Sequence, residues 1–349
     1  MITKAKTLYA VAVIGVVIVI IAAVANSSHN ISSINSSDPA IASAFHSTIE
    51  KKIAFIRPVF TAAAYRKLTN DGFYKFYSLH GIAGPRQGVQ YVTTDLQYLN
   101  VTVTEFYKTE SGDKITTLDK NLKEILPNVQ ISYLTDIDVH DDAIFNKNDH
   151  SNKYDVLILG HQEYVTQKEY DNFRTFVEQG GTIIFMDGNY FFAKVNWSSA
   201  TSTITLASGH GWAFNGTHVF KGPYEYFRTS NADWTGGNYY CNKCDSYQYD
   251  PFGYNSVKYE DEFIANNNSA GSDRVKIIAD YKARNQTVTV ATYEMDYGRG
   301  HVIVFGLSTE RVIASSPLFV SFFDYVLFKY AFDLPAENPL LAKERYQLP

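Results

Sequence analysis

Cysteine is scarce in this sequence of 349 residues, which contains only Cys241 and Cys244. The two form a single CNKC motif, and a zinc site would normally need two further Cys or His ligands at matched spacing. We therefore expect no structural zinc site. If the chain is exported, the pair predicts a disulfide that closes a short loop.

Clusters of basic residues and internal repeats are also missing. The net charge is -5, and Lys and Arg never gather into the basic patch that nucleic-acid binding requires. No repeat with a period of 20 to 50 residues is present, which argues against a repeat array. Hydrophobic residues make up 45% of the chain, enough for a large buried core.

Near the N-terminus, one long apolar run stands out. Every residue of 8–25 is apolar or small, and this length is close to the roughly 20 residues with which a helix crosses a membrane. Lys4 and Lys6 precede the run and predict that residues 1–7 stay in the cytoplasm. We expect a single-pass anchor in the cell membrane, with the rest of the chain outside. The alternative is secretion after cleavage behind Ala25, because residues 23–25 have the form of a signal-peptide site.

The segment after the apolar run is too polar to fold alone. Residues 26–50 begin with a stretch rich in Ser and Asn and predict a flexible stalk, followed by a folded domain at 51–335 and a tail at 336–349. Asn-x-Ser/Thr sequons are frequent, as expected of a glycosylated surface. In the folded part they lie at Asn100, Asn196, Asn215, Asn267 and Asn285.

Hydrophobic patterns predict an α/β domain with a mostly parallel sheet flanked by helices. Expected strands are 53–60, 98–107, 129–140, 153–160 and 182–188, followed by one at 274–281 and a hairpin at 287–306. Thr166 and Glu169 form a capping box that begins a helix, which ends at Gly180 and Gly181. A last helix begins at Ser316.

Residues 196–265 have a different composition. Tyr, Gly and Asn dominate this part of the chain, and helical periodicity is weak. We expect an insertion rich in loops and β-structure. Its tyrosines could fill a small core or stack on sugars.

A histidine and a glutamate follow the strand that ends in Gly160. In open α/β sheets the carboxyl ends of the strands form the ligand crevice, so His161 and Glu163 are candidate catalytic residues. They are two residues apart and face the same side of an extended segment. The simpler alternative is that both only satisfy nearby backbone groups.

A second polar pattern occurs in the expected strand 129–140. Asp136, Asp138 and His140 alternate with apolar residues, which would place them on one strand face next to His161 and Glu163. We expect this strand to neighbour the one that ends at Gly160. Alternatively, Asp136 and Asp138 cap a turn.

The segments YLTDIDVH and YDVLILGHQEYVTQKEYDNFRTFVEQGGTIIFMDGN resemble the C-terminal domain of the large subunit of N,N-dimethylformamidase. This domain has a glutamine-amidotransferase-like fold. The resemblance is specific over 129–190, looser over 53–80 and 287–332, and says little about 196–265.

The resemblance implies a mononuclear iron site held by two tyrosines and a glutamate, with a histidine beside it. Glu163 and His161 match the family's His-x-Glu-Tyr motif, and Tyr65 matches one tyrosine, although Arg66 stands where the family has Asn. The second tyrosine is placed at Tyr91, with Tyr98 or Tyr107 as alternatives. Phenolate and carboxylate oxygens suit oxidised iron, which would support hydrolysis of a small amide.

Cysteine-dependent glutaminase activity is not expected. In the better-known glutamine amidotransferases a cysteine follows the strand that corresponds to 182–188, whereas here Met186 and Asp187 occupy that turn. Without a thiolate no acyl-enzyme can form by that route.

Two functions remain open at this point. One is a membrane-anchored, outward-facing, iron-dependent hydrolase of small amides. The other is a non-catalytic ectodomain of the cell envelope that binds glycans or neighbouring surface proteins, as the sequons and the Tyr-rich insertion would allow.

Overall fold

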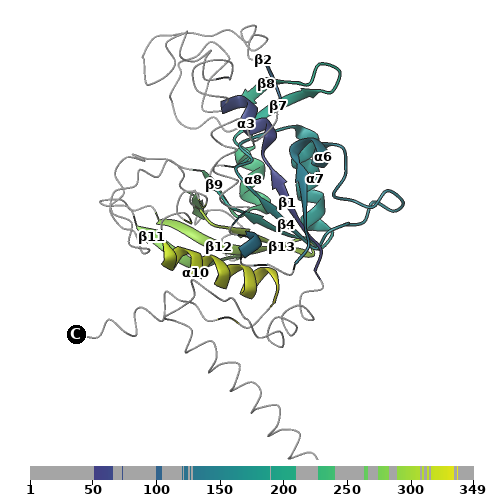
Figure 1. The fold of residues 1–349 in the computed structure, drawn as a ribbon. Helices are drawn as coiled ribbons and strands as arrows, with labels where there is room; N and C mark the ends of the chain where they lie inside the picture. Colours follow the sequence, from purple (N-terminus) through teal and green to yellow (C-terminus); the bar gives the residue numbers. More distant parts are fainter. Residues whose placement is uncertain are drawn as a thin grey trace, which may run out of the picture. The chain divides into compact units, whose positions relative to one another are not determined.

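The fold is given by a computed structural model, whose described residues all lie in one unit, Lys51–Pro349 (Figure 1). They are residues 51–65, 73, 100–103, 120, 122–124, 126, 129–188, 190–209, 227–239, 263–265, 274–282, 289–306, 309, 313, 316–333 and 336. The predicted segments 1–7, 8–25 and 26–50 lie outside this set. Among the helices that can be described, none is long and apolar enough to cross a membrane.

The largest sheet has seven strands in the order β11-β12-β13-β6-β4-β1-β3. Four strands run parallel beside one another, and β13 joins them in the same direction. The other two are antiparallel additions at one edge. The strands are β1 (Ile53–Arg57), β3 (Ile131–Thr135), β4 (Val156–Leu159), β6 (Thr182–Phe185), β11 (Val275–Lys282), β12 (Thr289–Tyr297) and β13 (Gly300–Val304). The expected α/β class is confirmed.

Helices cover both faces of this sheet. β4 is buried along its whole length, as its unbroken aliphatic sequence predicts for a strand covered on both sides. Helix α7 (Gln167–Glu178) packs against the face that includes Val302 and Val304. Helix α10 (Pro317–Val326) packs on the opposite face, where its phenylalanine rings contact Phe305.

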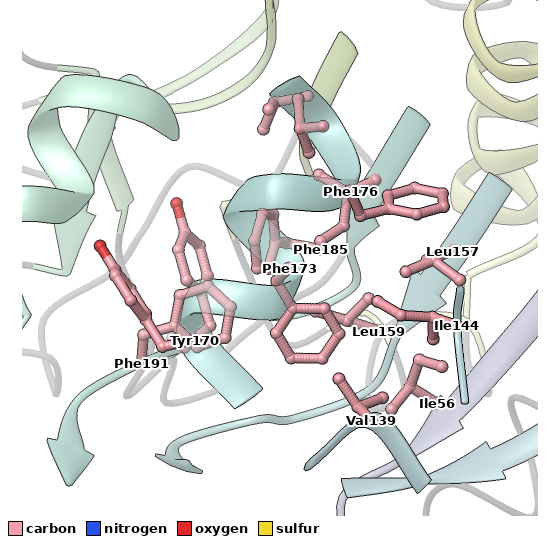
Figure 2. Close-up of a cluster of buried hydrophobic side chains, with 14 of the residues drawn as sticks. Ile56, Val139, Ile144, Leu157, Leu159, Tyr170, Phe173, Phe176, Phe185 and Phe191 are labelled. Atoms are coloured by element: carbon pink, nitrogen blue, oxygen red, sulfur yellow. The ribbon is translucent and has the colours of Figure 1, made fainter. Parts of the chain in front are cut away.

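Helix α7 follows the sequence prediction closely. The Thr166 hydroxyl accepts from the Glu169 N–H, and the Glu169 carboxylate accepts from the Thr166 N–H, so the capping box is confirmed. Tyr170, Phe173, Phe176 and Val177 are all buried. Figure 2 shows the rings of Phe173 and Phe176 among the aliphatic side chains of the sheet, with Tyr170 and Phe191 beside one another.

A second sheet lies beside the loop that follows β4. It has the order β2-β8-β7-β5, in which β5 pairs with β7 in parallel and the other pairs are antiparallel. Its strands are β2 (Asn100–Thr102), β5 (Tyr164–Val165), β7 (Ala193–Ser198) and β8 (Thr203–Gly209). Of the expected strand at 98–107, the structure describes only residues 100–103.

The rest of the predicted insertion is described in part. It contains α8 (Arg228–Trp234) and a two-stranded sheet of β9 (Gly237–Tyr239) and β10 (Phe263–Ala265). The indole of Trp234 is fully buried and donates to the Tyr170 hydroxyl at 2.7 Å, which ties this part of the insertion to α7. The short helix α8 was not expected from the sequence.

The predicted strand at 129–140 is wrong in its second half. β3 ends at Thr135, and Asp136–His140 forms the helix α6. A capping box causes the change, because the Asp138 carboxylate accepts from the Thr135 N–H at 2.8 Å while the Thr135 hydroxyl accepts from the Asp138 N–H. The alternative that an aspartate of this segment caps a turn is therefore closer to what is found.

Two further details of the prediction are corrected. β3 does not neighbour β4, because β1 lies between them and pairs with both. The strand expected at 53–60 ends at Arg57, and α3 (Val59–Tyr65) follows Pro58, whose carbonyl accepts from the Ala62 N–H. Proline cannot donate to a strand ladder but is well suited to the start of a helix.

The C-terminal elements agree with the sequence. β12 and β13 form a hairpin with its turn at Gly298 and Arg299. Ser316 caps α10 by accepting from the Phe319 N–H at 3.2 Å, and Pro317 is the first helical residue. The helix continues into a π-helical turn at Leu327–Ala331.

Candidate functional site

The candidate site is built on the loop between β4 and α7. Its backbone is fixed on one side by α3, where the Thr61 hydroxyl accepts from the N–H groups of Glu163 and Tyr164 at 3.0 and 3.1 Å. The Gln162 amide donates to the Ile56 carbonyl in β1 at 2.9 Å. Both anchors are buried, so the first strand and the helix after it determine where this loop lies.

The second sheet fixes the loop from the other side. The Phe191 N–H donates to the Gln162 carbonyl at 2.8 Å, and the N–H groups of Phe192 and Ala193 donate to the Glu163 carbonyl. β5 then continues this pairing with β7. The loop is therefore held on rigid elements, which is what a precise site requires.

His161 lies between two buried carboxylates. Its Nε2 is 3.2 Å from Glu163 Oε2, and its Nδ1 is 3.5 Å from Asp187 Oδ2. The side chains of Glu163 and Asp187 are 0% and 1% exposed, whereas that of His161 is 16% exposed. An imidazole placed in this way can move a proton between a buried carboxylate and a bound molecule.

Tyr65, the last residue of α3, reaches the same place. Its ring centroid lies 5.8 Å from that of His161 and 6.3 Å from that of Tyr164. Tyr164 is itself buried and packs edge-on against Phe73 at 5.4 Å. The structure thus brings together the histidine, the glutamate and the first tyrosine that the sequence singled out.

Asp187 is the site residue that the sequence prediction missed. β4 and β6 are parallel neighbours in which Leu159 pairs with Phe185. The residues two positions beyond each partner are His161 and Asp187, so the register alone places them side by side. The rule that strand ends form the ligand crevice could have identified Asp187, had it been applied to β6 as well as to β4.

Asp136, Asp138 and His140 do not line one strand face beside this site. Asp136 accepts from the Phe60 N–H at 2.6 Å, and Asp138 caps its own helix. His140 Nδ1 lies 2.8 Å from the Thr166 hydroxyl, and burial lowers the pKa of its imidazole. These contacts give all three residues structural roles at the ends of α3, α6 and α7.

Several predicted residues fall outside the described part of the chain. They are the second tyrosine ligand Tyr91, the pair Cys241 and Cys244, and the sequons at Asn215, Asn267 and Asn285. Asn100 lies in β2, and Asn196 lies in β7 with its side chain exposed to solvent.

The donor set at the site suits a hard metal ion. Glu163 supplies a buried carboxylate and Tyr65 a phenol, and oxygen donors of this kind favour oxidised iron. Within the described residues, no group of three or more His, Cys, Asp or Glu side chains could hold a metal ion. A ligand set of one carboxylate and two phenols does not need such a group, so the residues present fit iron in their chemistry.

Comparison with known proteins relates the first part of the folded chain to one family. Residues 38–208 match the model of the family described as "N,N-dimethylformamidase beta subunit-like, C-terminal". This match covers the candidate site and the elements that anchor it. No sequence among the curated proteins matches the chain.

The chain also has a distant likeness to several solved structures. They include a β-galactosidase from Bacillus circulans sp. alkalophilus (TM-score 0.34, 13% identity, 76% of this chain and 30% of that chain). An exo-β-1,4-mannosidase from an Opitutaceae bacterium gives a TM-score of 0.35 at 10% identity, over 82% of this chain and 37% of that chain. A "Putative thua-like protein" from Bacteroides uniformis gives a TM-score of 0.34 at 14% identity, over 66% of this chain and 88% of that chain. Because these TM-scores are below 0.5, no function is inferred from them.

Proposed function

Because residues 38–208 match the dimethylformamidase-like family model, we propose that the chain is an iron-dependent hydrolase of small linear amides. The observation that carries this proposal is the position of His161 between the buried carboxylates of Glu163 and Asp187, with the Tyr65 ring beside it. A proton carrier and oxygen donors for a metal thus lie at the end of a central strand.

Glu163 and Tyr65 would hold the iron, together with a second tyrosine that we place at Tyr91. Bound iron would supply Lewis acidity toward the amide carbonyl. The chain itself supports this site with its backbone, because Thr61 and the strand β7 fix the loop on which Glu163 lies.

His161 would handle the protons of the reaction. In amide hydrolysis a water O–H bond and the amide C–N bond break, while a C–O bond and an N–H bond form. One group must therefore accept a proton from water and deliver one to the leaving nitrogen. His161 is suited to this role because its imidazole is partly exposed, and the carboxylate of Asp187 can orient it through Nδ1.

The iron content of the purified full-length chain tests this proposal. We expect stoichiometric iron in the unaltered chain and at least a tenfold loss in Glu163→Gln, since the loss of one ligand typically weakens a metal site strongly. Glu124→Gln is the matched control, because Glu124 is exposed and lies outside the site. Tyr65→Phe should weaken the visible charge-transfer absorption of ferric phenolate, because only the second tyrosine would remain to give it. Equal iron in Glu163→Gln and Glu124→Gln would contradict the ligand assignment.

The alternative function predicts a different outcome. A non-catalytic ectodomain that binds glycans or surface proteins would contain no iron in any variant and would not hydrolyse N,N-dimethylformamide or formamide. Under either function we propose the same placement, with residues 8–25 as a membrane anchor and the folded domain outside the cytoplasm.

A further inference from the structure

Two carboxyl groups meet in the core beneath the candidate site. Asp136 is the first residue of α6, and Glu169 lies in the first turn of α7. Both side chains are 0% exposed, and they interact directly with each other. Neither residue has a part in the function proposed above, so the pair needs a separate explanation.

In each carboxyl of the pair, one oxygen accepts a backbone hydrogen bond and the other does not. Asp136 Oδ2 accepts from the Phe60 N–H at 2.6 Å, and Glu169 Oε2 accepts from the Thr166 N–H at 3.3 Å. By strict geometry neither Asp136 Oδ1 nor Glu169 Oε1 has a hydrogen-bond partner among the described residues, although the Gln162 side chain lies close to the Asp136 carboxyl. A single proton between these two oxygens would satisfy both.

The charges found to act on the pair from the described residues are negative. The other charge that acts on Asp136 is the carboxylate of Asp138, and the charge that acts on Glu169 is that of Asp136 itself. Other titratable groups on the surrounding elements have contacts of their own. The Arg57 guanidinium lies over the Tyr133 ring, and Arg174 pairs with Glu178. Lys168 pairs with Asp142, His140 contacts Thr166, His161 lies between Glu163 and Asp187, and Tyr65 packs on His161.

Two ionised carboxylates in buried contact are costly, and proteins relieve the cost by keeping one of them protonated. Desolvation raises the pKa of Asp136 to about 7. Desolvation, followed by the charge of Asp136, raises the pKa of Glu169 well above its ordinary value. At neutral pH the pair therefore retains a proton.

Three segments of the candidate site meet at this pair. Asp136 accepts from Phe60 at the start of α3, the helix that carries Thr61 and Tyr65. Glu169 closes the capping box of α7. The side chain of Gln162, between His161 and Glu163, also contacts the Asp136 carboxyl.

We propose that Asp136 and Glu169 share one proton, and that the protonated pair holds Gln162, and with it the loop of residues 161–163, in position. Both carboxyls are positioning residues in this proposal, because they act on the site through Gln162 and α3. The inference needs neither iron nor a substrate and so does not depend on the function proposed above.

Hydrogen exchange of the full chain as a function of pH tests this directly. After correction for the intrinsic pH dependence, we expect exchange of the amides in 160–166 to increase about tenfold per pH unit between about pH 5 and pH 7 in the unaltered chain. In this range the closed state holds the shared proton and opening releases it. In Glu169→Gln the corrected exchange should not change with pH. The new amide can accept from Thr166 and donate to Asp136 Oδ1 without any proton to lose.

Two further variants make the test decisive. Asp141→Asn, an exposed position beside α6, should keep the pH dependence of the unaltered chain. Asp136→Asn should abolish it as Glu169→Gln does, and it replaces Glu169→Gln if that variant does not fold. A pH dependence that is the same in all four proteins would overturn the proposal, as would loop exchange that is independent of pH in the unaltered chain.

Discussion

Gly300, the first residue of β13, lies against the C-terminal end of α7. A Cβ atom at this position would collide with the backbone carbonyl oxygens of Val177 and Gly181. The His301 N–H donates to the Gly181 carbonyl at 3.1 Å, so the two chain segments touch through their backbones. Because the neighbouring atoms belong to the backbone, no side-chain rotation could make room for a Cβ atom at Gly300.

From this contact we expect Gly300→Ala to lower the free energy of unfolding by about 3 kcal/mol, the upper part of the range for overpacking. Gly180→Ala is the comparison. Its φ of +105° disfavours an L-residue, but the nearest atoms to its Cβ lie at 3.8 Å, so a cost of about 1 kcal/mol is expected. Urea titrations of both variants measure the difference. Equal costs would mean that conformational strain, and not the close contact, dominates.

At the scale of single elements, two capping boxes determine how α6 and α7 begin. The box at Thr166 and Glu169 was identified from the sequence because a long amphipathic helix follows it. The box at Thr135 and Asp138 has the same form but precedes a single turn. There the alternation of Asp and aliphatic residues fits a strand equally well, and only tertiary contacts such as that of Asp136 with Phe60 decide.

We expect Thr166→Ala to destabilise the domain by about 1–2 kcal/mol, because it removes the helix cap. The variant also removes the contact between the Thr166 hydroxyl and His140 Nδ1. Thr166→Ser keeps the hydroxyl and should lower the stability of the domain much less. Thermal unfolding followed by circular dichroism distinguishes the two, and equal destabilisation would exclude the hydroxyl as the cause.

At the scale of the whole molecule, the sequence predicted which segments form the sheet better than it predicted their order. Buried parallel strands can be recognised in the sequence by aliphatic runs such as that of β4. Nothing local specifies that β1 separates β3 from β4, because this order depends on long-range packing. For the same reason Tyr65, His161 and Glu163 were found from motifs, whereas Asp187 became visible only once β4 and β6 were paired.

The stability of the whole domain should also depend on Asp324 in α10. Burial raises the pKa of its carboxyl to about 7. A raised pKa in the folded state means that the contribution to stability is complete below the unfolded pKa and is lost as the pH rises through about 7. Asp324→Asn removes this titration. As the pH rises from 5 to 8.5, we expect its free energy of unfolding to increase relative to that of the unaltered chain by on the order of 1–2 kcal/mol.

The control for this measurement is Asp171→Asn, which changes an exposed aspartate on α7. Denaturant midpoints at the two pH values give the comparison. If the stabilities of Asp324→Asn and Asp171→Asn depend on pH in the same way, ionisation of the Asp324 carboxyl does not destabilise the folded domain.

The interior position of β1 determines how the domain would respond to a mechanical load. Tension applied to the chain ahead of Lys51 would enter through β1, which pairs with β3 on one side and β4 on the other. Both ladders run parallel to β1 and would be sheared along their length, so their hydrogen bonds would have to yield together and not one after another. A pull from that end would therefore load β3 and β4, the two neighbours of β1, before the strands β6, β13, β12 and β11.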